Sequence, residues 1–140
     1  MNKNMQEWIT GMILGLIITL LLAVKVMAAP IDEDLITRTV YLEAGNQSLE
    51  GKRLVAAVIL NRIDSEEFPD TTEEVLSQDG QFVTYKNLDN ATPTWEDALA
   101  VKMEIQTRSN EEVMFFQTGK YGTGKPCMKV GDHYFSTIKK

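Results

Sequence analysis

The sequence has almost none of the side chains that build zinc sites and disulfides. Its 140 residues include one cysteine, Cys127, and one histidine, His133. A single cysteine excludes an intrachain disulfide, and one histidine with one cysteine does not supply the usual zinc ligand set. Oxygen ligands for calcium or magnesium stay open, although no EF-hand spacing occurs. We therefore expect a protein without a metal or another cofactor.

Motifs for nucleotide binding and for covalent catalysis are also missing. The glycines near residues 119–124 are not followed by GK[ST], and no strand–helix frame surrounds them, so a phosphate loop is not expected. Cys127 has no local catalytic motif, and no serine stands in a Gly-x-Ser-x-Gly elbow. The net charge is −6, whereas nucleic acid binding needs a basic face. We expect no nucleic acid partner.

One long apolar run lies near the N-terminus, from Ile9 to Val24. It is short for a membrane-spanning helix, which needs about 20 apolar residues, but it becomes long enough if Lys25 reaches past residues 26–29 to the membrane surface. Alternatively, residues 1–29 are a signal peptide that is cleaved near the small residues Ala28 and Ala29. Both interpretations place residues 30–140 outside the cytoplasm, as a membrane-anchored or a secreted domain.

Residues 30–140 have the length of one domain, and their pattern predicts a mainly helical α+β fold. Helices are predicted over residues 33–44, 49–63, 71–76 and 95–107. Asp32 and Ser48 are suited to cap the first two helices, and Gly45 is suited to end the first one in a left-handed conformation.

The segment 85–91 is polar, and its pattern predicts irregular structure. Short strands are predicted over residues 113–116, 127–130 and 133–135, the last two around a turn at Gly131 and Asp132. The strands would form a small antiparallel region after the helices.

One acidic residue falls on the side of the first domain helix that should be buried. On a helical wheel, Glu43 lies between Thr39 and Ile36 in a mostly apolar arc, opposite a side formed by Arg38, Tyr41 and Thr37. A helix normally keeps glutamate on its solvated face. A carboxyl group in apolar surroundings keeps its proton more readily, as a general acid must. Glu43 is therefore a catalytic candidate, although a hydrogen-bonded structural role also explains the pattern.

Other side chains could contribute to a binding site, and each has a structural explanation as well. Gln81 and Phe82 could present an amide and a ring to a sugar, or Phe82 could pack in the core. Tyr41 and Trp95 could stack on a ligand, although a core or interfacial role is the default for both.

Two further candidates carry nitrogen atoms. Arg62, after Asn61 at the end of the second helix, could pair with the helix C-terminus or with a carboxylate. His133 could act as a base or as an oriented structural histidine. A paired-carboxylate glycosidase would need a second acid opposite Glu43, for which Glu50, Asp79 and Asp132 are available.

Several stretches stand in a recognisable order from about residue 35 to residue 135. They include Thr39–Ala44 (TVYLEA), Leu54–Ile63 (LVAAVILNRI), Gly80–Phe82 (GQF) and Gly131–Phe135 (GDHYF). Each stretch alone is weak, but together, with family-like spacing, they resemble the bacterial cell wall hydrolases of the spore-cortex-lytic, SleB-like type.

This resemblance implies a peptidoglycan-cleaving domain with a lysozyme-like helical lobe and a small strand-containing lobe. It implies that Glu43 is the catalytic acid of a lytic transglycosylase, which acts between N-acetylmuramic acid and N-acetylglucosamine. It implies that Gln81 and Phe82 line the glycan cleft and that Asn61, Arg62 and His133 support it. Tyr41, a possible stacking surface, is added to these as a predicted substrate-binding residue. The expected partners are glycan strands, and the N-terminal helix would contact a membrane; we expect a monomer.

The sequence departs from the family pattern just after the catalytic position. The family commonly has Arg-Gly-Glu after the Glu-Ala pair, whereas Gly45, Asn46 and Gln47 stand here, so that Gln47 replaces an acid. Two other functions therefore stay open: a hydrolytic muramidase that uses a second carboxylate such as Asp79, and a catalytically weak accessory protein that binds glycan.

Overall fold

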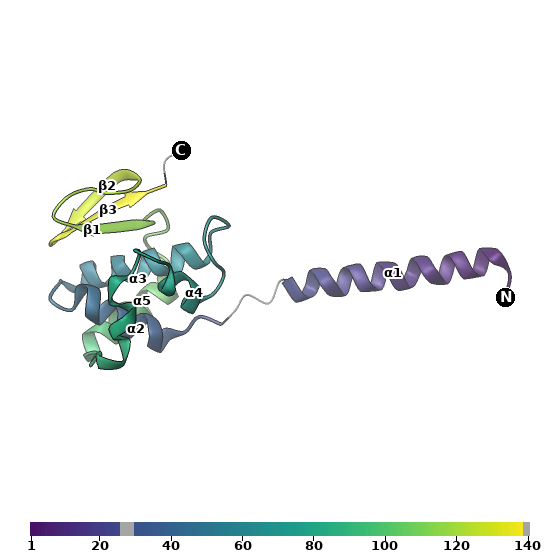
Figure 1. The fold of residues 1–140 in the computed structure, drawn as a ribbon, viewed down its shortest axis with the longest axis horizontal. Coiled ribbons are helices and arrows are strands. Elements are labelled where there is room, and N and C mark those ends of the chain that lie inside the picture. The colour runs from purple at the N-terminus through teal and green to yellow at the C-terminus, as the bar shows by residue number, and fades with distance from the viewer. Residues whose placement is uncertain (26–29, 139–140) are drawn as a thin grey trace.

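Helices make up one lobe of the fold and a small sheet makes up the other (Figure 1). The structure is a computed structural model that describes residues 1–25 and 30–138. The helices are α1 (Lys3–Lys25), α2 (Glu33–Ala44), α3 (Leu49–Ile63), α4 (Thr72–Ser77), the 3-10 helix η1 (Val83–Asn90) and α5 (Trp95–Thr107). The strands are β1 (Phe115–Thr118), β2 (Lys125–Val130) and β3 (His133–Thr137). The prediction of a mainly helical α+β fold is confirmed.

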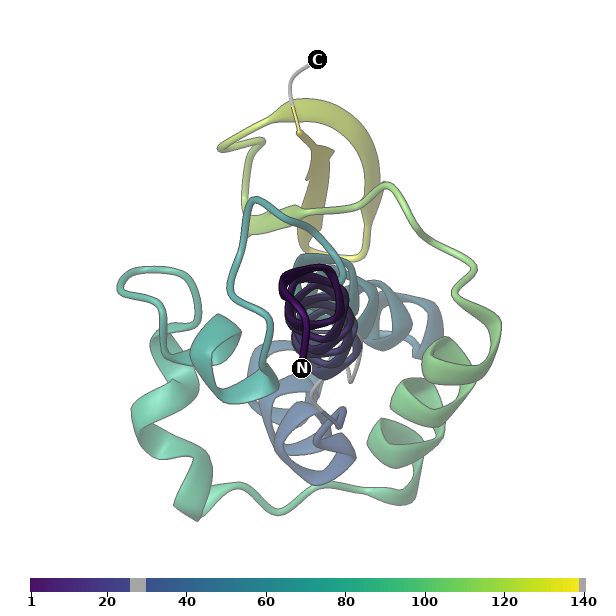
Figure 2. The same ribbon diagram turned by 90° about the vertical axis from the view of Figure 1, so that its right-hand side faces the viewer.

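Helix α1 lies apart from the two lobes, and Figure 2 views it end-on. Up to Ile18 its apolar side chains are exposed, as Trp8 and Leu16 illustrate with exposed fractions of 76% and 69%. In the part of the chain that the structure describes, no helix is long and apolar enough to cross a membrane. The expected cleavage near Ala28 and Ala29 falls in residues 26–29, outside the described residues.

Side-chain caps fix where the helices of the domain begin. The cap residues are Asp32, Ser48, Thr71 and Thr94. The last is part of a reciprocal capping box, in which Thr94 accepts a hydrogen bond from the backbone N–H of Asp97 and the Asp97 carboxylate accepts one from the Thr94 N–H. These caps occupy N–H groups that have no partner inside the helix, which explains why the predicted starts of α2, α3 and α5 are confirmed.

Three local predictions are wrong. Gly45 is right-handed, with φ of −58°, and glycine is needed there because a Cβ atom would lie 2.5 Å from the backbone oxygen of Tyr41. The segment 85–91, expected to be irregular, belongs to η1 except for Ala91. The first strand begins at Phe115 rather than at Val113, because the Val113 carbonyl accepts a hydrogen bond from the Asn61 side chain at 2.8 Å.

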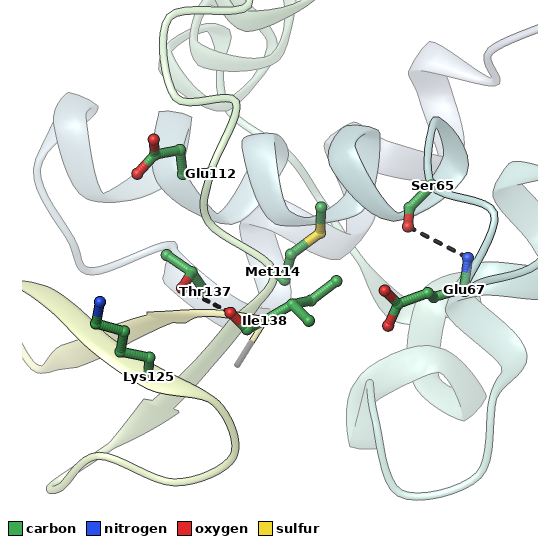
Figure 3. Close-up of a pocket in the computed structure, with 7 residues that line it drawn as sticks. All are labelled: Ser65, Glu67, Glu112, Met114, Lys125, Thr137 and Ile138. Atoms are coloured by element: carbon green, nitrogen blue, oxygen red, sulfur yellow. Dashed lines mark hydrogen bonds between the residues drawn. The ribbon is translucent and has the colours of Figure 1, made fainter. Parts of the chain in front are cut away.

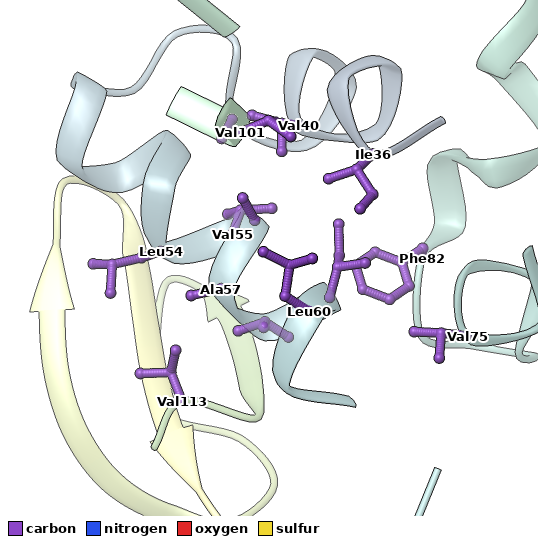
Figure 4. Packing of buried hydrophobic residues seen from close by; sticks show 14 of the residues in the cluster. Ile36, Val40, Leu54, Val55, Ala57, Leu60, Val75, Phe82, Val101 and Val113 are labelled. Carbon is purple, nitrogen blue, oxygen red and sulfur yellow. The ribbon is translucent and has the colours of Figure 1, made fainter. Parts of the chain in front are cut away.

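The core is centred on α3, whose side chains are buried on nearly all sides. From Leu54 to Leu60 no residue is more than 1% exposed. Helices α2 and α5 pack on α3 from the helical lobe, and β1 approaches it from the sheet. Figure 4 shows Val40 and Val101 on one side of this helix and Val113 on the other. One apolar helix thus joins both lobes, so the space between them is held in a fixed geometry.

Helix α2 is surrounded on more sides than its amphipathic pattern predicts. Thr37, expected on the solvated side, is only 7% exposed, because α3, α5 and η1 all pack against α2. Glu43, expected in the middle of the buried arc, is half-buried at the end of the helix. The wheel therefore identifies the unusual acid correctly but overstates how deeply it is buried.

The sheet has the strand order β1-β3-β2, and both pairs of strands are antiparallel. One face of β3 carries His133 and Phe135 into the core, where they pack on Phe116 of β1. The predicted turn at Gly131 and Asp132 is confirmed. Side chains alternate along a strand, so the other face of the sheet carries a different set, which includes Gln117 and Tyr134.

Candidate active site

A cleft of about 390 Å³ lies between the helical lobe and the sheet. The helical lobe contributes the end of α2, the end of α3 and the turn before η1, and the sheet contributes β1, β3 and the loop after β1. The lining residues are Glu43, Arg62, Gly80, Gln81, Val83, Phe115, Phe116, Gln117, Thr118, Gly122, Thr123, Tyr134 and Ser136. Among these described residues Glu43 is the only acidic one. The cleft thus combines one carboxyl group with several amides, hydroxyls and aromatic rings, which suits a sugar polymer.

Glu43 is held in the cleft by one hydrogen bond from another helix. Thr84, in the first turn of η1, donates its hydroxyl to Oε1 of Glu43 at 2.6 Å. Glu43 is the last residue of α2 but one, and its side chain lines the cleft, whereas its neighbour Ala44 is fully buried in the core. One carboxyl oxygen is therefore engaged by Thr84, and the group faces a space large enough for substrate.

The predicted pair Gln81 and Phe82 divides into two different roles. Gln81 is exposed and lines the cleft beside Gly80, whose φ of +74° makes the turn. Phe82 is only 4% exposed, and its ring packs 6.1 Å from that of Phe116. The Gln81 amide can therefore reach a ligand. The Phe82 ring packs in the core beneath the turn and holds the turn in place.

Arg62 lies beneath the cleft in a cage of aromatic rings. Its guanidinium carbon is 5.0 to 5.3 Å from the ring centroids of Phe68, Phe82 and Phe115, and its Nε donates to the Met114 carbonyl at 2.8 Å. Burial lowers the pKa of Arg62 to about 10, so the group is still charged at neutral pH. Its Nη1 atom is buried and has no hydrogen-bond partner among the described residues.

Phe82 is not among the residues that line the cleft, and neither are the other three predicted binding residues. Asn61 is buried, and its amide donates to the carbonyls of Asn110 and Val113. The hydroxyl of Tyr41 lies 3.3 Å from that of Thr92. His133 is 3% exposed and packs in the core beside the rings of Phe116 and Phe135. Their contacts in the structure support the fold around the cleft.

Gln47, which stands where the family commonly has an acid, joins the two lobes at one end. Its Nε2 donates to the Asp132 carboxylate at 3.2 Å and to the Asn46 side chain at 2.8 Å, and its Oε1 accepts from the Asp132 N–H. A carboxylate at this position would lack the donor and would face another carboxylate. The amide and Asp132 are therefore chemically matched.

A second cavity, of about 420 Å³, lies beside the connection that follows α3 (Figure 3). It is lined by Ser65, Glu67, Glu112, Met114, Lys125, Thr137 and Ile138. None of the predicted site residues is among them. Over the described ranges, no group of three or more histidine, cysteine or acidic side chains is arranged to hold a metal ion.

Comparison with known proteins identifies the class. Residues 46–136 match the family described as Cell Wall Hydrolase, and the chain belongs to this family of enzymes. The match begins three residues after Glu43. No curated protein matches the sequence.

Two solved structures with a similar fold indicate which type of cell wall hydrolase this chain resembles. The catalytic domain of the Bacillus cereus SleB protein is 27% identical, with a TM-score of 0.66 over 76% of this chain and 89% of that chain. The catalytic domain of the germination-specific lytic transglycosylase SleB from Bacillus anthracis has the same fold; it is 24% identical, with a TM-score of 0.67 over 80% of this chain and 98% of that chain. The protein is thus an SleB-like cell wall hydrolase, an enzyme that acts on peptidoglycan outside the cytoplasm.

Sequence reasoning missed Thr84 and the cleft residues of the sheet. Thr84 follows Phe82 by two positions in a segment without a clear period, so no pattern marks it. Gln117 and Tyr134 lie on strands too short to show which face points toward the cleft. Their register could be deduced only once the strand pairing is known.

Proposed function

We propose that the protein cleaves the glycan strand of peptidoglycan as a lytic transglycosylase, with Glu43 as a single acid and base. Protonated Glu43 gives its proton to the glycosidic oxygen between N-acetylmuramic acid and N-acetylglucosamine, and the C1–O4 bond breaks. The carboxylate then takes the proton of the muramic 6-hydroxyl as O6 attacks C1. The products are a 1,6-anhydromuramic end and a chain that begins with N-acetylglucosamine, and Glu43 is protonated again.

The observation that carries this proposal is the single carboxylate of the cleft. An inverting or double-displacement glycosidase needs two carboxyl groups across the scissile bond, whereas an internal hydroxyl nucleophile needs only one. The Bacillus anthracis neighbour is described as a lytic transglycosylase, which is consistent with the same chemistry here.

The other site residues take supporting roles in this proposal. Gln81, which is exposed in the cleft, donates a hydrogen bond to a substrate oxygen, and the buried guanidinium of Arg62 supplies a positive charge beneath the substrate. Phe82, Asn61 and His133 position the turn and the sheet, and Tyr41 offers a stacking surface beside the cleft.

Product analysis separates the proposal from its two alternatives. Purified, reduced glycan strands are digested and the products are identified by mass spectrometry. Anhydromuramic ends are expected. Reducing muramic ends would instead indicate a hydrolytic muramidase in which a second carboxylate such as Asp79 activates water. Intact strands that stay bound to the protein would indicate a glycan-binding accessory protein.

Substitution of Glu43 tests the assignment of the acid. Glu43→Gln keeps the shape of the side chain but removes the transferable proton, and we expect wall solubilisation to fall by roughly 10²- to 10⁴-fold. Glu66→Gln, at an exposed acid in the connection that follows α3, is the matched control and should retain full activity. A fully active and folded Glu43→Gln protein would refute the role of this residue.

We further propose that residues 1–29 carry the domain out of the cytoplasm, either as an anchor or as a cleaved signal. The mass of the mature protein decides between the two, because a chain that starts near Ala29 has been cleaved. An intact N-terminus in the membrane fraction supports the anchor, and an intact chain in the cytoplasmic fraction would contradict both.

A further inference from the structure

A row of three side chains leads from the cleft out across the sheet. Gln117 of β1 pairs with Tyr134 of β3, and Tyr134 pairs with Lys129 of β2. Residues directly opposite each other on neighbouring strands project to the same face of a sheet. Gln117 and Tyr134 line the cleft, whereas Lys129 is exposed beyond it. The row therefore extends the surface of the cleft away from Glu43.

The loop after β1 folds back onto this row and fixes it. The ring of Tyr121 packs edge to face on Tyr134, with centroids 5.0 Å apart and an interplanar angle of 82°. Gly122 lies directly against Gln117, because a Cβ atom at this position would lie 1.9 Å from the Gln117 Oε1 atom. The Lys129 ammonium also approaches this ring and lies 5.1 Å from the Tyr134 ring centroid. Tyr134 is thus in contact with both an aromatic ring and a positive charge.

The charge of the row differs from that of the rest of the protein. Residues 30–114 contain many more acidic than basic side chains, whereas residues 115–137 contain Lys120, Lys125 and Lys129 and one acid, Asp132. The Asp132 carboxylate already accepts a hydrogen bond from Gln47. No ion pair joins Lys129 to a carboxylate among the residues that the structure describes. Its charge is therefore available to an anionic ligand that approaches along the cleft.

We propose that the row of Gln117, Tyr134 and Lys129 is an outer binding site for the peptide-bearing side of the glycan. Lys129 binds a carboxylate of the peptide attached to the muramyl residue, and the Gln117 amide and Tyr134 hydroxyl bind neighbouring amide or sugar oxygens. The inference rests on the proposed function, since it assumes that a glycan strand lies in the Glu43 cleft. It names the substrate class as glycan with charged peptide stems, oriented with those stems toward the sheet.

Binding to walls in the Glu43→Gln background tests the proposal. Walls are stripped of teichoic acids, so that the peptide carboxylates are the main anions, and bound protein is measured by co-sedimentation at low salt. We expect Lys129→Gln to bind about three- to fivefold more weakly, as befits the loss of one exposed charge contact. Lys102→Gln, an exposed lysine on α5, is the matched control and should bind like the parent.

A second substrate shows whether the peptide carboxylates cause the difference in wall binding between Lys129→Gln and its parent. The same walls are treated with a carbodiimide and ammonia, which converts free carboxyl groups into amides without cutting the glycan. On these walls the difference between Lys129→Gln and its parent should disappear. The proposal is overturned if Lys129→Gln binds untreated walls like the parent, if the loss persists on amidated walls, or if Lys102→Gln loses as much. An active Glu43→Gln enzyme would sink the proposed function but leave this binding comparison intact.

Discussion

The Thr84 hydroxyl of η1 donates a hydrogen bond to Oε1 of Glu43 in α2 at 2.6 Å, although the two residues are 41 positions apart in the sequence. A carboxyl group turns easily about its last bond, so a single strong partner decides which oxygen faces the substrate. With Oε1 engaged, the other oxygen is the one free to exchange a proton with the glycan.

This contact predicts that Thr84 positions the acid without touching the reacting atoms. Thr84→Val keeps the shape but removes the donor, and we expect the rate constant for wall solubilisation to fall about tenfold, with little change in the substrate concentration needed for half-maximal rate. Thr84→Ser retains the hydroxyl and should recover most of the rate. Equal losses in both variants would indicate that packing, rather than the hydrogen bond, matters at this position.

Gln47 is predicted to be adapted to Asp132. Gln47→Glu, which introduces the acid common in the family, should lower the free energy of unfolding by about 0.5–1 kcal/mol at pH 7, because two partly exposed carboxylates would then face each other. Adding Asp132→Asn to Gln47→Glu should recover the loss, because the new amide can donate to the glutamate. Urea unfolding of both single variants and the double variant measures the coupling, and simple additivity would contradict it.

Lys52 should matter more for stability than any other lysine of the described helical lobe. Its ammonium lies 3.0 Å from the Asp97 carboxylate, and the two side chains are 3% and 0% exposed. Burial alone would raise the pKa of Asp97, but hydrogen bonds from Thr94 and Lys52 lower it below its usual value, so the carboxylate is charged. Removing Lys52 would leave this buried charge without its partner.

Lys52→Met should therefore lower the free energy of unfolding by roughly 3 kcal/mol. The exposed Lys102→Met should change it by less than about 0.5 kcal/mol. Equilibrium denaturation of the two variants checks the difference, and similar small effects would show that the buried pair adds nothing.

His133 is predicted to make the free energy of unfolding fall as the pH drops below the ordinary histidine pKa of 6.5. Burial lowers the pKa of His133 below its usual 6.5, and the charge of Asp132 offsets only part of this effect. The folded protein thus resists a proton that the unfolded chain accepts. The contribution is fully present above pH 6.5 and is lost as the pH falls through the lowered pKa of the folded state.

The measurement compares wild type with His133→Phe, which has no titrating group and keeps an aromatic ring beside Phe116 and Phe135. The free energy of unfolding is measured between pH 7.5 and pH 5. Wild type should lose more stability than the variant over this interval. Parallel curves would show that His133 is protonated as easily in the fold as in the unfolded chain.

The helices can be predicted from the sequence because their signals are local. Asp32, Ser48 and Thr94 each accept a hydrogen bond from the N–H group three residues further on, so a short window contains both partners. The start of β1 is harder to predict. The Val113 carbonyl just before the strand accepts a hydrogen bond from the side chain of Asn61, which is 52 residues away in the sequence. A short sequence window does not contain both of these residues.

The site residues also differ in how well the sequence predicts them. The family motif and the wheel both indicate Glu43, and the structure places it in a cleft. Arg62, by contrast, is expected from the sequence to pair with a helix end or a carboxylate, yet it lies among Phe68, Phe82 and Phe115. These rings come from three separate segments, so their convergence is a tertiary property that composition and spacing do not contain.

The free edge of strand β2 affects how readily copies of the protein could associate when they are crowded together. Among the described residues, no strand pairs with β2 on its outer side, and an open strand edge can recruit a strand from another molecule. Here that strand carries Lys125 and Lys129, Pro126 offers no N–H, and the pairing is irregular between Pro126 and Met128. Like charges and a broken hydrogen-bonding row make this edge a poor template for aggregation. Copies that lie close together on one wall surface therefore gain little from pairing through this edge.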